Sequence, residues 1–366
     1  MKHPPHDFAP AASRVRQRLL SVQALRAVAA LLVVLFHLRT GELKYLAGPA
    51  VLEDLARHAS AGVDLFFIIS GFVMTTLAAG RYTSPGAGLN FLMKRVWRVV
   101  PLYWLFTTTV VVLMAVAPSI INSTYAEQSY ALSYFLVPHA QMPLLSVGWT
   151  LEHEAYFYLV FAAFLAIVPE RFVSHGLTAW AALIGLASLW HDTDATPVHI
   201  LVTSPLTIEF IAGALIGLHW RRIPPPLAVP LLAAGVGMYV CAATLLPTTG
   251  LETLNEWHRV AIFGSCMLLV FTGLVSLEGF DRLSVPAWLT RLGDSSYSIY
   301  LSHMFVIAVV GRAWAWWVPV SGSVSHLIFV AATVLACCVV GNAVHRWVER
   351  PLLEMPSRLR ARHRAY

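Results

Sequence analysis

The sequence predicts an all-α membrane protein that crosses the bilayer about ten times, and three observations support this fold class. Hydrophobic residues make up 58% of the 366-residue chain and charged residues only 12%, about half the charged share of a soluble globular protein. Several apolar runs last about 18 residues or more, the length that spans a bilayer as a helix. None shows the alternation of a transmembrane strand, so the spans are expected to be helical.

Ten spans are expected, and polar or helix-breaking segments separate them. RYTSPGAG at 81–88, the prolines at 224–226 and LPTTG at 246–250 each lie between two apolar runs. We expect spans near residues 19–38, 62–80, 99–118, 149–168, 177–190, 205–220, 227–246, 258–277, 296–318 and 326–347. The first run follows a basic leader but has no small-residue cleavage site after it, so we expect it to be retained as a helix.

The positions of Lys and Arg predict that both termini are cytoplasmic. With the N-terminus inside, 19 of the 25 Lys and Arg residues fall in cytoplasmic segments and five in outer segments, and Arg26 lies within the first span. Such an excess on one side indicates the cytoplasmic face. The chain is therefore expected to be a multi-pass membrane protein with cytoplasmic termini and the lipid bilayer as its solvent.

No second folding unit is visible in the sequence. Residues 1–18 are expected to form a disordered cytoplasmic N-terminus, 19–350 one transmembrane domain, and 351–366 a basic tail at the membrane surface. The longest outer loop, about 119–148, contains no Lys or Arg. It is long enough to form a lid or an acceptor surface, and it is equally explained as a connector.

The sequence gives no sign of a nucleic-acid site, a cysteine-pair site or a zinc site. The formal net charge of +6 comes from basic residues in short loops and near the C-terminus. This placement indicates that the charges orient the protein in the membrane, and no nucleic-acid partner is expected. The four cysteines fall within apolar runs and form no CxxC pair, as expected for small core residues. HEAYF lacks the second histidine of the HExxH zinc motif, so no metal site is expected.

Two ionisable residues interrupt the first apolar run, SVQALRAVAALLVVLFHL at 21–38. Arg26 and His37 are eleven positions apart, which places them on one helix face and about 16 Å apart along the axis. Arg26 then lies toward the cytoplasm and His37 toward the outside. A basic residue reaching the interface and a histidine capping the span would be a structural explanation, whereas intramembrane ionisable residues also mark functional sites. This stretch alone leaves both explanations open.

Polar residues also lie in or beside the second and third spans. Asp64 and Ser70 belong to GVDLFFIISGFVMT, where Asp64 is also typical of a plain helix start. Arg95 and Arg98 lie three positions apart in FLMKRVWRVVPLYW, just before the third span, and point the same way on a helix. Arginine forks suit phosphate, which coenzyme A brings from the cytosol. Taken alone, the pair is better explained as a positive-inside anchor.

The stretch VGWTLEHEAYFYLV, residues 147–160, places two carboxylates at the outer end of the fourth span. Burying Glu152 and Glu154 there is costly unless each has a partner. Because His37 also lies in the outer half of its helix, Glu154 and His37 are candidates for a carboxylate–imidazole pair. In RLGDSSYSIYLSHMF, residues 291–305, a further polar stripe either anchors the ninth span at the interface or lines a cavity. It consists of Ser296, Tyr300 and His303.

Together these stretches resemble the acyltransferase-3 family of bacterial membrane acyltransferases over about residues 20–350. No motif is decisive alone, but the order of the six motifs is specific. Their residues are most similar to those of the exopolysaccharide-production (ExoZ-like) branch. The motifs are Arg-x10-His at 26 and 37, GVDLFFIISGF, RxxR at 95 and 98, WTLEHEAYFY with Glu154 at the family's glutamate position, LGDSSYSIYLSH and Glu349-Arg350-Pro351.

The resemblance implies transfer of an acyl group, usually acetyl, from cytosolic acyl-CoA to a sugar hydroxyl. The acceptor would be a cell-envelope or extracellular polysaccharide or its lipid-linked precursor, and polysaccharide-biosynthesis machinery would be a further partner. No metal is required. Two departures are noted: Glu152 replaces a small polar residue common in the family, and the soluble esterase-like domain of some relatives is expected to be missing.

The implied chemistry gives each candidate residue a role. A neutral histidine suits a base near neutral pH, so we expect His37 to deprotonate the hydroxyl, with Glu154 orienting it as the acid of a triad does. Arg26 would stabilise charge on the donor or on the oxyanion, and Arg95 and Arg98 would hold donor phosphates. Direct transfer and an acyl-enzyme intermediate both remain open. Substrate contacts are expected from Asp64, Ser70, Trp149, Glu152, Tyr297, Tyr300 and His303.

A transporter or flippase for an envelope glycan or lipid is the alternative function, since it explains intramembrane charge equally well. Such folds often contain inverted repeats, and the Arg-His motif has no counterpart in the second half of this chain. A structural member of an export complex is a third possibility. Release of coenzyme A by the purified protein distinguishes the enzyme from both.

Overall fold

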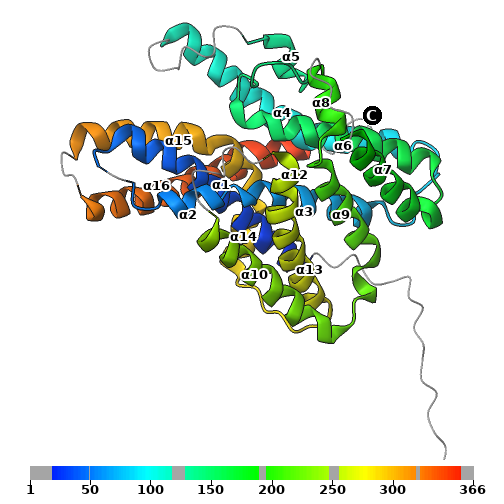
Figure 1. Cartoon of the computed structure of the whole chain (residues 1–366). Coiled ribbons are helices and arrows are strands. Elements are labelled where there is room, and N and C mark those ends of the chain that lie inside the picture. Colours follow the sequence, from blue (N-terminus) through cyan, green and yellow to red (C-terminus); the bar gives the residue numbers. More distant parts are fainter. Residues whose placement is uncertain are drawn as a thin grey trace, which may run out of the picture.

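The computed structural model describes residues 19–48, 50–117, 128–188, 195–246, 255–318 and 322–355. These residues form helices and connecting segments without a strand (Figure 1). The expectations for residues 1–18 and for the end of the basic tail lie outside the described residues, as does the start of the long outer loop.

Most of the described residues belong to long helices joined by short helical turns. The α-helices are α1 (Leu20–Tyr45), α2 (Glu53–His58), α3 (Ala61–Ala78), α4 (Ala87–Val116), α5 (Tyr130–Tyr134), α6 (Trp149–Ile167), α7 (Val173–Ala187), α8 (Pro197–Thr203), α9 (Thr207–His219), α10 (Ala228–Leu245), α12 (Glu256–Arg259), α13 (Ser265–Gly279), α14 (Ala287–Asp294), α15 (Ser296–Trp317) and α16 (Ser323–Val344). Two π-helical segments, η8 (Val260–Gly264) and η9 (His345–Glu349), continue α12 and α16. Single 3-10 turns lie at η4 (Ser146–Gly148), η5 (Glu170–Phe172), η6 (Trp220–Arg222) and η7 (Pro225–Leu227).

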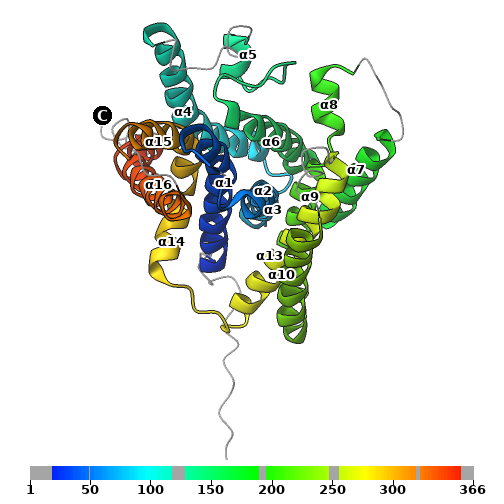
Figure 2. The same cartoon turned by 60° about the vertical axis from the view of Figure 1, so that its left-hand side comes forward.

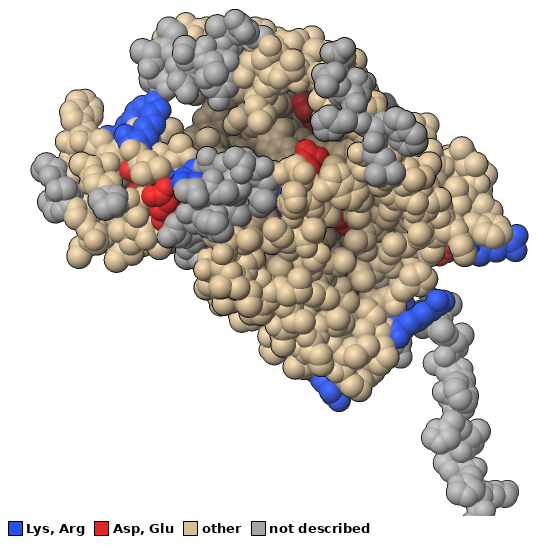
Figure 3. Space-filling view, viewed as in Figure 1, with Lys and Arg blue, Asp and Glu red and all other residues tan. Residues whose placement is uncertain are grey.

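Nine helices of the described residues are long and apolar enough to cross a membrane. They confirm the all-α polytopic class and match nine of the ten expected spans. The remaining one, near 177–190, corresponds to α7, which has 15 residues and is therefore shorter than a usual span. Uncharged residues dominate the face in Figure 3, with charged side chains at its margins and around a hollow.

The third span begins earlier than the sequence predicts. Its helix, α4, starts at Ala87, next to the left-handed Gly86, rather than near residue 99. The basic residues before the apolar run set the predicted boundary, but charged side chains do not end a helix. Pro101 lies within the helix, and Arg95 and Arg98 therefore lie on a continuous helix instead of before it.

Helix α1 lies at the centre of the bundle and contacts α3, α14 and α15 (Figure 2). Its residues Ala27, Ala29 and Ala30 are fully buried, so neighbouring helices approach its backbone closely, as is common in membrane bundles. Helices α3 and α9 also approach each other closely. A Cβ atom at Gly71 of α3 would collide with backbone atoms of Phe210 on α9. This packing brings α1, α3, α4, α6 and α15 around one cavity.

Candidate active site

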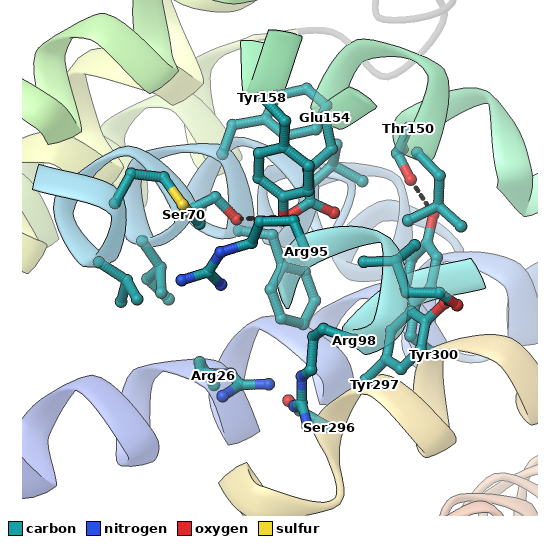
Figure 4. A pocket seen from close by; sticks show the side chains of 18 residues that line it. Arg26, Ser70, Arg95, Arg98, Thr150, Glu154, Tyr158, Ser296, Tyr297 and Tyr300 are labelled. Atoms are coloured by element: carbon teal, nitrogen blue, oxygen red, sulfur yellow. Dashed lines mark hydrogen bonds between the residues drawn. The ribbon is translucent and has the colours of Figure 1, made fainter. Parts of the chain in front are cut away.

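A cavity of about 130 Å³ lies among the helices where most of the predicted site residues converge. Helix α1 contributes Arg26, α4 contributes Arg95 and Arg98, and α6 contributes Glu154. Figure 4 shows Arg95 beside Tyr158 on the side of the Glu154 carboxylate, with Arg26 and Arg98 on the other side of the same space. Ser70, Tyr158, Ser296, Tyr297 and Tyr300 complete the polar part of the lining.

The three arginines differ in how their charge is balanced. Nη1 of Arg98 lies 2.9 Å from Oε1 of Glu349, which is 1% exposed and also accepts a hydrogen bond from Ser298. Nη1 of Arg26 lies 3.5 Å from the Gln23 side chain. The Arg95 guanidinium packs over the Phe91 and Tyr158 rings, 5.5 and 5.9 Å from their centres. Within the part of the chain that the structure describes, no carboxylate is paired with Arg26 or Arg95.

A second, more open hollow adjoins the cavity and shares Arg26 and Arg98 with it. Gln23, Asp294, His345 and Arg350 line the rest of it. The two hollows therefore join through a pair of arginines, near the end of the bundle that the Lys and Arg count predicts to be cytoplasmic. Anionic groups at this junction would meet several guanidinium donors, the arrangement that suits phosphate.

Glu154 is not joined to His37 in this structure. Its carboxylate accepts hydrogen bonds from Ser70, at 3.0 Å, and from Tyr158 in the next turn of α6. Among the described residues, no bond links it to an imidazole. The predicted carboxylate–imidazole pair is therefore wrong, because helix packing turns Glu154 into the arginine-lined cavity and leaves His37 outside its lining.

The described partner of His37 is another predicted residue, His303 of α15. Nδ1 of His37 lies 3.2 Å from Nε2 of His303 and 3.0 Å from the Val33 carbonyl oxygen. His303 is fully buried, and its own Nδ1 lies 2.6 Å from the Tyr300 carbonyl oxygen. The structure thus joins two imidazoles instead of an imidazole and a carboxylate.

Tyr300 separates the arginine-lined cavity from the two histidines. It lines the cavity, and its ring centre lies 5.9 Å from that of His303. Its hydroxyl lies 2.6 Å from the Thr150 hydroxyl and donates a 2.8 Å hydrogen bond to the Val147 carbonyl (Figure 4). The end of the outer loop, through Val147, thereby holds one wall of the cavity.

The other predicted substrate residues have different surroundings. Tyr297 lines the cavity and donates a hydrogen bond to the Val99 carbonyl. Asp64 is fully buried and paired with Arg259, whose Nη2 lies 2.6 Å from its carboxylate. Trp149 packs beside Phe67 outside the cavity lining. Glu152 is also outside that lining, and its Oε1 is buried without a described hydrogen-bond partner.

Sequence reasoning did not assign roles to Arg259, His345, Ser298 or Thr150. For His345 the sequence does contain a signal, because its i, i+4 spacing from Glu349 indicates a contact on one helix face. In the structure Nδ1 of His345 lies 2.8 Å from the Glu349 carboxylate. The others meet partners far away in the chain, such as Ser298 with Glu349, and local spacing carries no information about such contacts.

Comparison with known proteins provides a family assignment. The family model described as "Acyltransferase domain" (acyltransferase-3) matches residues 19–342. Exopolysaccharide production protein ExoZ of Rhizobium meliloti is 35% identical over 80% of this chain and 89% of that protein. Nodulation protein 10 of Rhizobium leguminosarum bv. viciae is 27% identical over 73% of this chain and 78% of its own length.

A more distant relative is O-acetyltransferase OatA of Staphylococcus aureus, at 22% identity over 91% of this chain and 57% of that protein. No solved structure matches the chain. The relatives agree with the resemblance that the sequence motifs indicate, including its exopolysaccharide branch.

Proposed function

Because the chain belongs to the acyltransferase-3 family of membrane acyltransferases, we propose that it transfers an acetyl group from cytosolic acetyl-CoA to a polysaccharide hydroxyl. The acceptor is an extracellular or cell-envelope polysaccharide or its lipid-linked precursor, and the enzyme acts in the bacterial cytoplasmic membrane. The exopolysaccharide role in the printed name of ExoZ supports this acceptor class. The family assignment favours the enzyme over the transporter alternative.

One observation carries the donor assignment: three arginines from two helices converge on a cavity among membrane-spanning helices. A soluble anion gains from several guanidinium groups in such a low-dielectric site. Acyl-CoA combines phosphates with a long neutral arm, so its phosphates would lie at Arg26 and Arg98, where the two hollows join. Arg95 would be a third contact from inside the cavity.

The geometry also favours one of the two roles expected for Arg26. It lines both hollows beside Arg98, whereas His37 lies about 16 Å farther along α1. A base and an oxyanion donor act on the same carbonyl, within hydrogen-bond reach of it. Arg26 therefore stabilises charge on the donor and not on the oxyanion.

In this proposal the reaction takes place beside His37. The imidazole removes the proton of the sugar hydroxyl, the oxygen attacks the thioester carbonyl, and the carbon–sulfur bond breaks to release the thiolate. The thioester reaches His37 by passing the Tyr300 ring, which forms the wall between the two regions. Glu154 supplies a carboxylate to the arginine-lined cavity and accepts hydrogen bonds there.

Thiol release tests the proposal directly. Purified protein in lipid nanodiscs is mixed with acetyl-CoA and with polysaccharide from cells that lack the protein. We expect free coenzyme A and a mass increase of one acetyl ester in the glycan, and both should form at least about 10²-fold more slowly with His37→Gln. Glycan movement across a vesicle membrane without thiol release would contradict the proposal in favour of a transporter.

A further inference from the structure

We propose that His303 is the positioning residue of His37: it accepts a hydrogen bond from Nδ1–H of His37 and leaves Nε2 of His37 as the basic atom. This inference rests on the proposed function, because it specifies which atom takes the proton of the acceptor hydroxyl. It gives His303 the role that the sequence assigned to Glu154.

The hydrogen-bond partners determine where each ring carries its proton. A backbone carbonyl can only accept, so the 2.6 Å contact between Nδ1 of His303 and the Tyr300 carbonyl requires a proton on that nitrogen. The 3.0 Å contact between Nδ1 of His37 and the Val33 carbonyl requires the same of His37. A neutral imidazole carries one such proton, so Nε2 of each ring is an acceptor.

The charge state follows from the surroundings of the two rings. No carboxylate among the described residues is bonded to either imidazole. Burying a cation without a partner is strongly unfavourable, and His303 is fully buried. Both rings are therefore neutral, and the 3.2 Å contact between them is a hydrogen bond from Nδ1–H of His37 to Nε2 of His303.

This arrangement prepares Nε2 of His37 for proton transfer. Nδ1 is occupied by Val33 and His303, while in the described structure no protein group is bonded to Nε2. His37 is partly exposed, unlike His303, so the free nitrogen is on the accessible ring. When Nε2 takes the hydroxyl proton, the Nε2 lone pair of His303 stabilises the resulting imidazolium through the same hydrogen bond. The proton then passes to the departing thiolate.

Two substitutions of His303 separate this role from simple packing. His303→Leu removes the acceptor and fills much of the space with an apolar side chain. We expect kcat to fall by about 10- to 100-fold, by analogy with the loss of a hydrogen-bond partner of a metal-bound histidine. The KM for acetyl-CoA should change little, because the arginines bind the donor. His303→Gln places an amide oxygen near the former Nε2 and should restore most of the activity.

A double-mutant cycle tests whether His303 acts through His37. In a His37→Gln background the base is absent, so adding His303→Leu should cost almost nothing further. Glu154→Gln is the matched control, because its partners are Ser70 and Tyr158, and its effect should persist in the same background. If the His303→Leu loss instead multiplies with that of His37→Gln, His303 only maintains the fold and the inference is wrong.

A measurement independent of activity separates this inference from the proposed function. Nitrogen-15 NMR of histidine-labelled protein, assigned by the loss of signals in His37→Gln and His303→Gln, reports which ring nitrogen carries the proton. We expect protonated Nδ1 and unprotonated Nε2 on both rings. A proton on Nε2 of His37 would overturn the inference even in an active enzyme, whereas absent thiol release with the expected tautomers would count against the reaction alone.

Discussion

Arg98 of α4 lies 2.9 Å from Glu349 at the end of the last helix, so an arginine of the cavity also neutralises an almost fully buried carboxylate. Ser298 and His345 bind the second oxygen of the same carboxylate. Arg98 therefore has two tasks, stabilising the bundle and lining the cavity, and substitutions can separate them.

We predict that Arg98→Ala destabilises the protein as well as weakening donor binding. Removing one partner leaves a buried charge, at a cost of about 3 kcal/mol, the low end of the range for such pairs, because Ser298 and His345 still bind Glu349. The half-life of the folded protein at elevated temperature measures the loss. Arg98→Met with Glu349→Gln should restore the half-life without restoring the KM for acetyl-CoA. A double variant as unstable as Arg98→Ala would show that the pair is not responsible.

Arg95 should affect the donor without affecting stability, because no described carboxylate depends on it. Losing one charged contact to phosphate costs about 1.5–3 kcal/mol, so Arg95→Ala should raise the KM for acetyl-CoA at least tenfold, roughly. The KM for the glycan should change less. Arg171→Ala is the control, since Arg171 lies on η5 and packs over Phe172, outside the cavity lining. An unchanged KM for acetyl-CoA in Arg95→Ala would show that Arg95 does not bind the donor and serves as a positive-inside anchor.

His37 and Glu154 should act independently. His37→Gln cannot take a proton, so the rate should fall by about 10²-fold or more. Glu154→Gln should impair transfer separately, because the cavity loses a negative charge among its arginines. Rates of the two single variants and the double variant are compared at saturating acetyl-CoA. We expect the losses to multiply; a double variant no slower than His37→Gln would indicate a coupling that the structure does not contain.

Helix α7 determines the topology of the second half of the chain. If this 15-residue helix crosses the membrane, as the ten-span interpretation requires, residue 195 is outside and residue 225 is cytoplasmic. Cysteine-free protein carrying Ala195→Cys should then react with an impermeant thiol reagent in intact cells, as should Tyr130→Cys. Labelling of Pro225→Cys in place of Ala195→Cys would place α7 on one side of the membrane and the C-terminus outside.

The sequence predicted the helices well because length and hydropathy are local properties. It predicted the site less completely, since the rotation of one helix against another depends on packing over the whole bundle. Arg26 and His37 share a helix face, yet only Arg26 lines the cavity. The polar stripe of α15 included His303, but its contact with His37 joins positions 266 residues apart, which local spacing does not predict.

Arg26 and His37 lie on one continuous helix, so under the proposed roles this helix sets the distance that the donor has to span. A helix that rises about 1.5 Å per residue would hold the proposed phosphate contact at Arg26 and the proposed base at His37 about 16 Å apart. Acetyl phosphate, in which one oxygen joins the acyl carbon to phosphorus, is too short to occupy both ends at once. A nucleotide with a long, flexible, uncharged arm can do so, and α1 would thus select the activated acyl carrier by its length before any chemistry occurs.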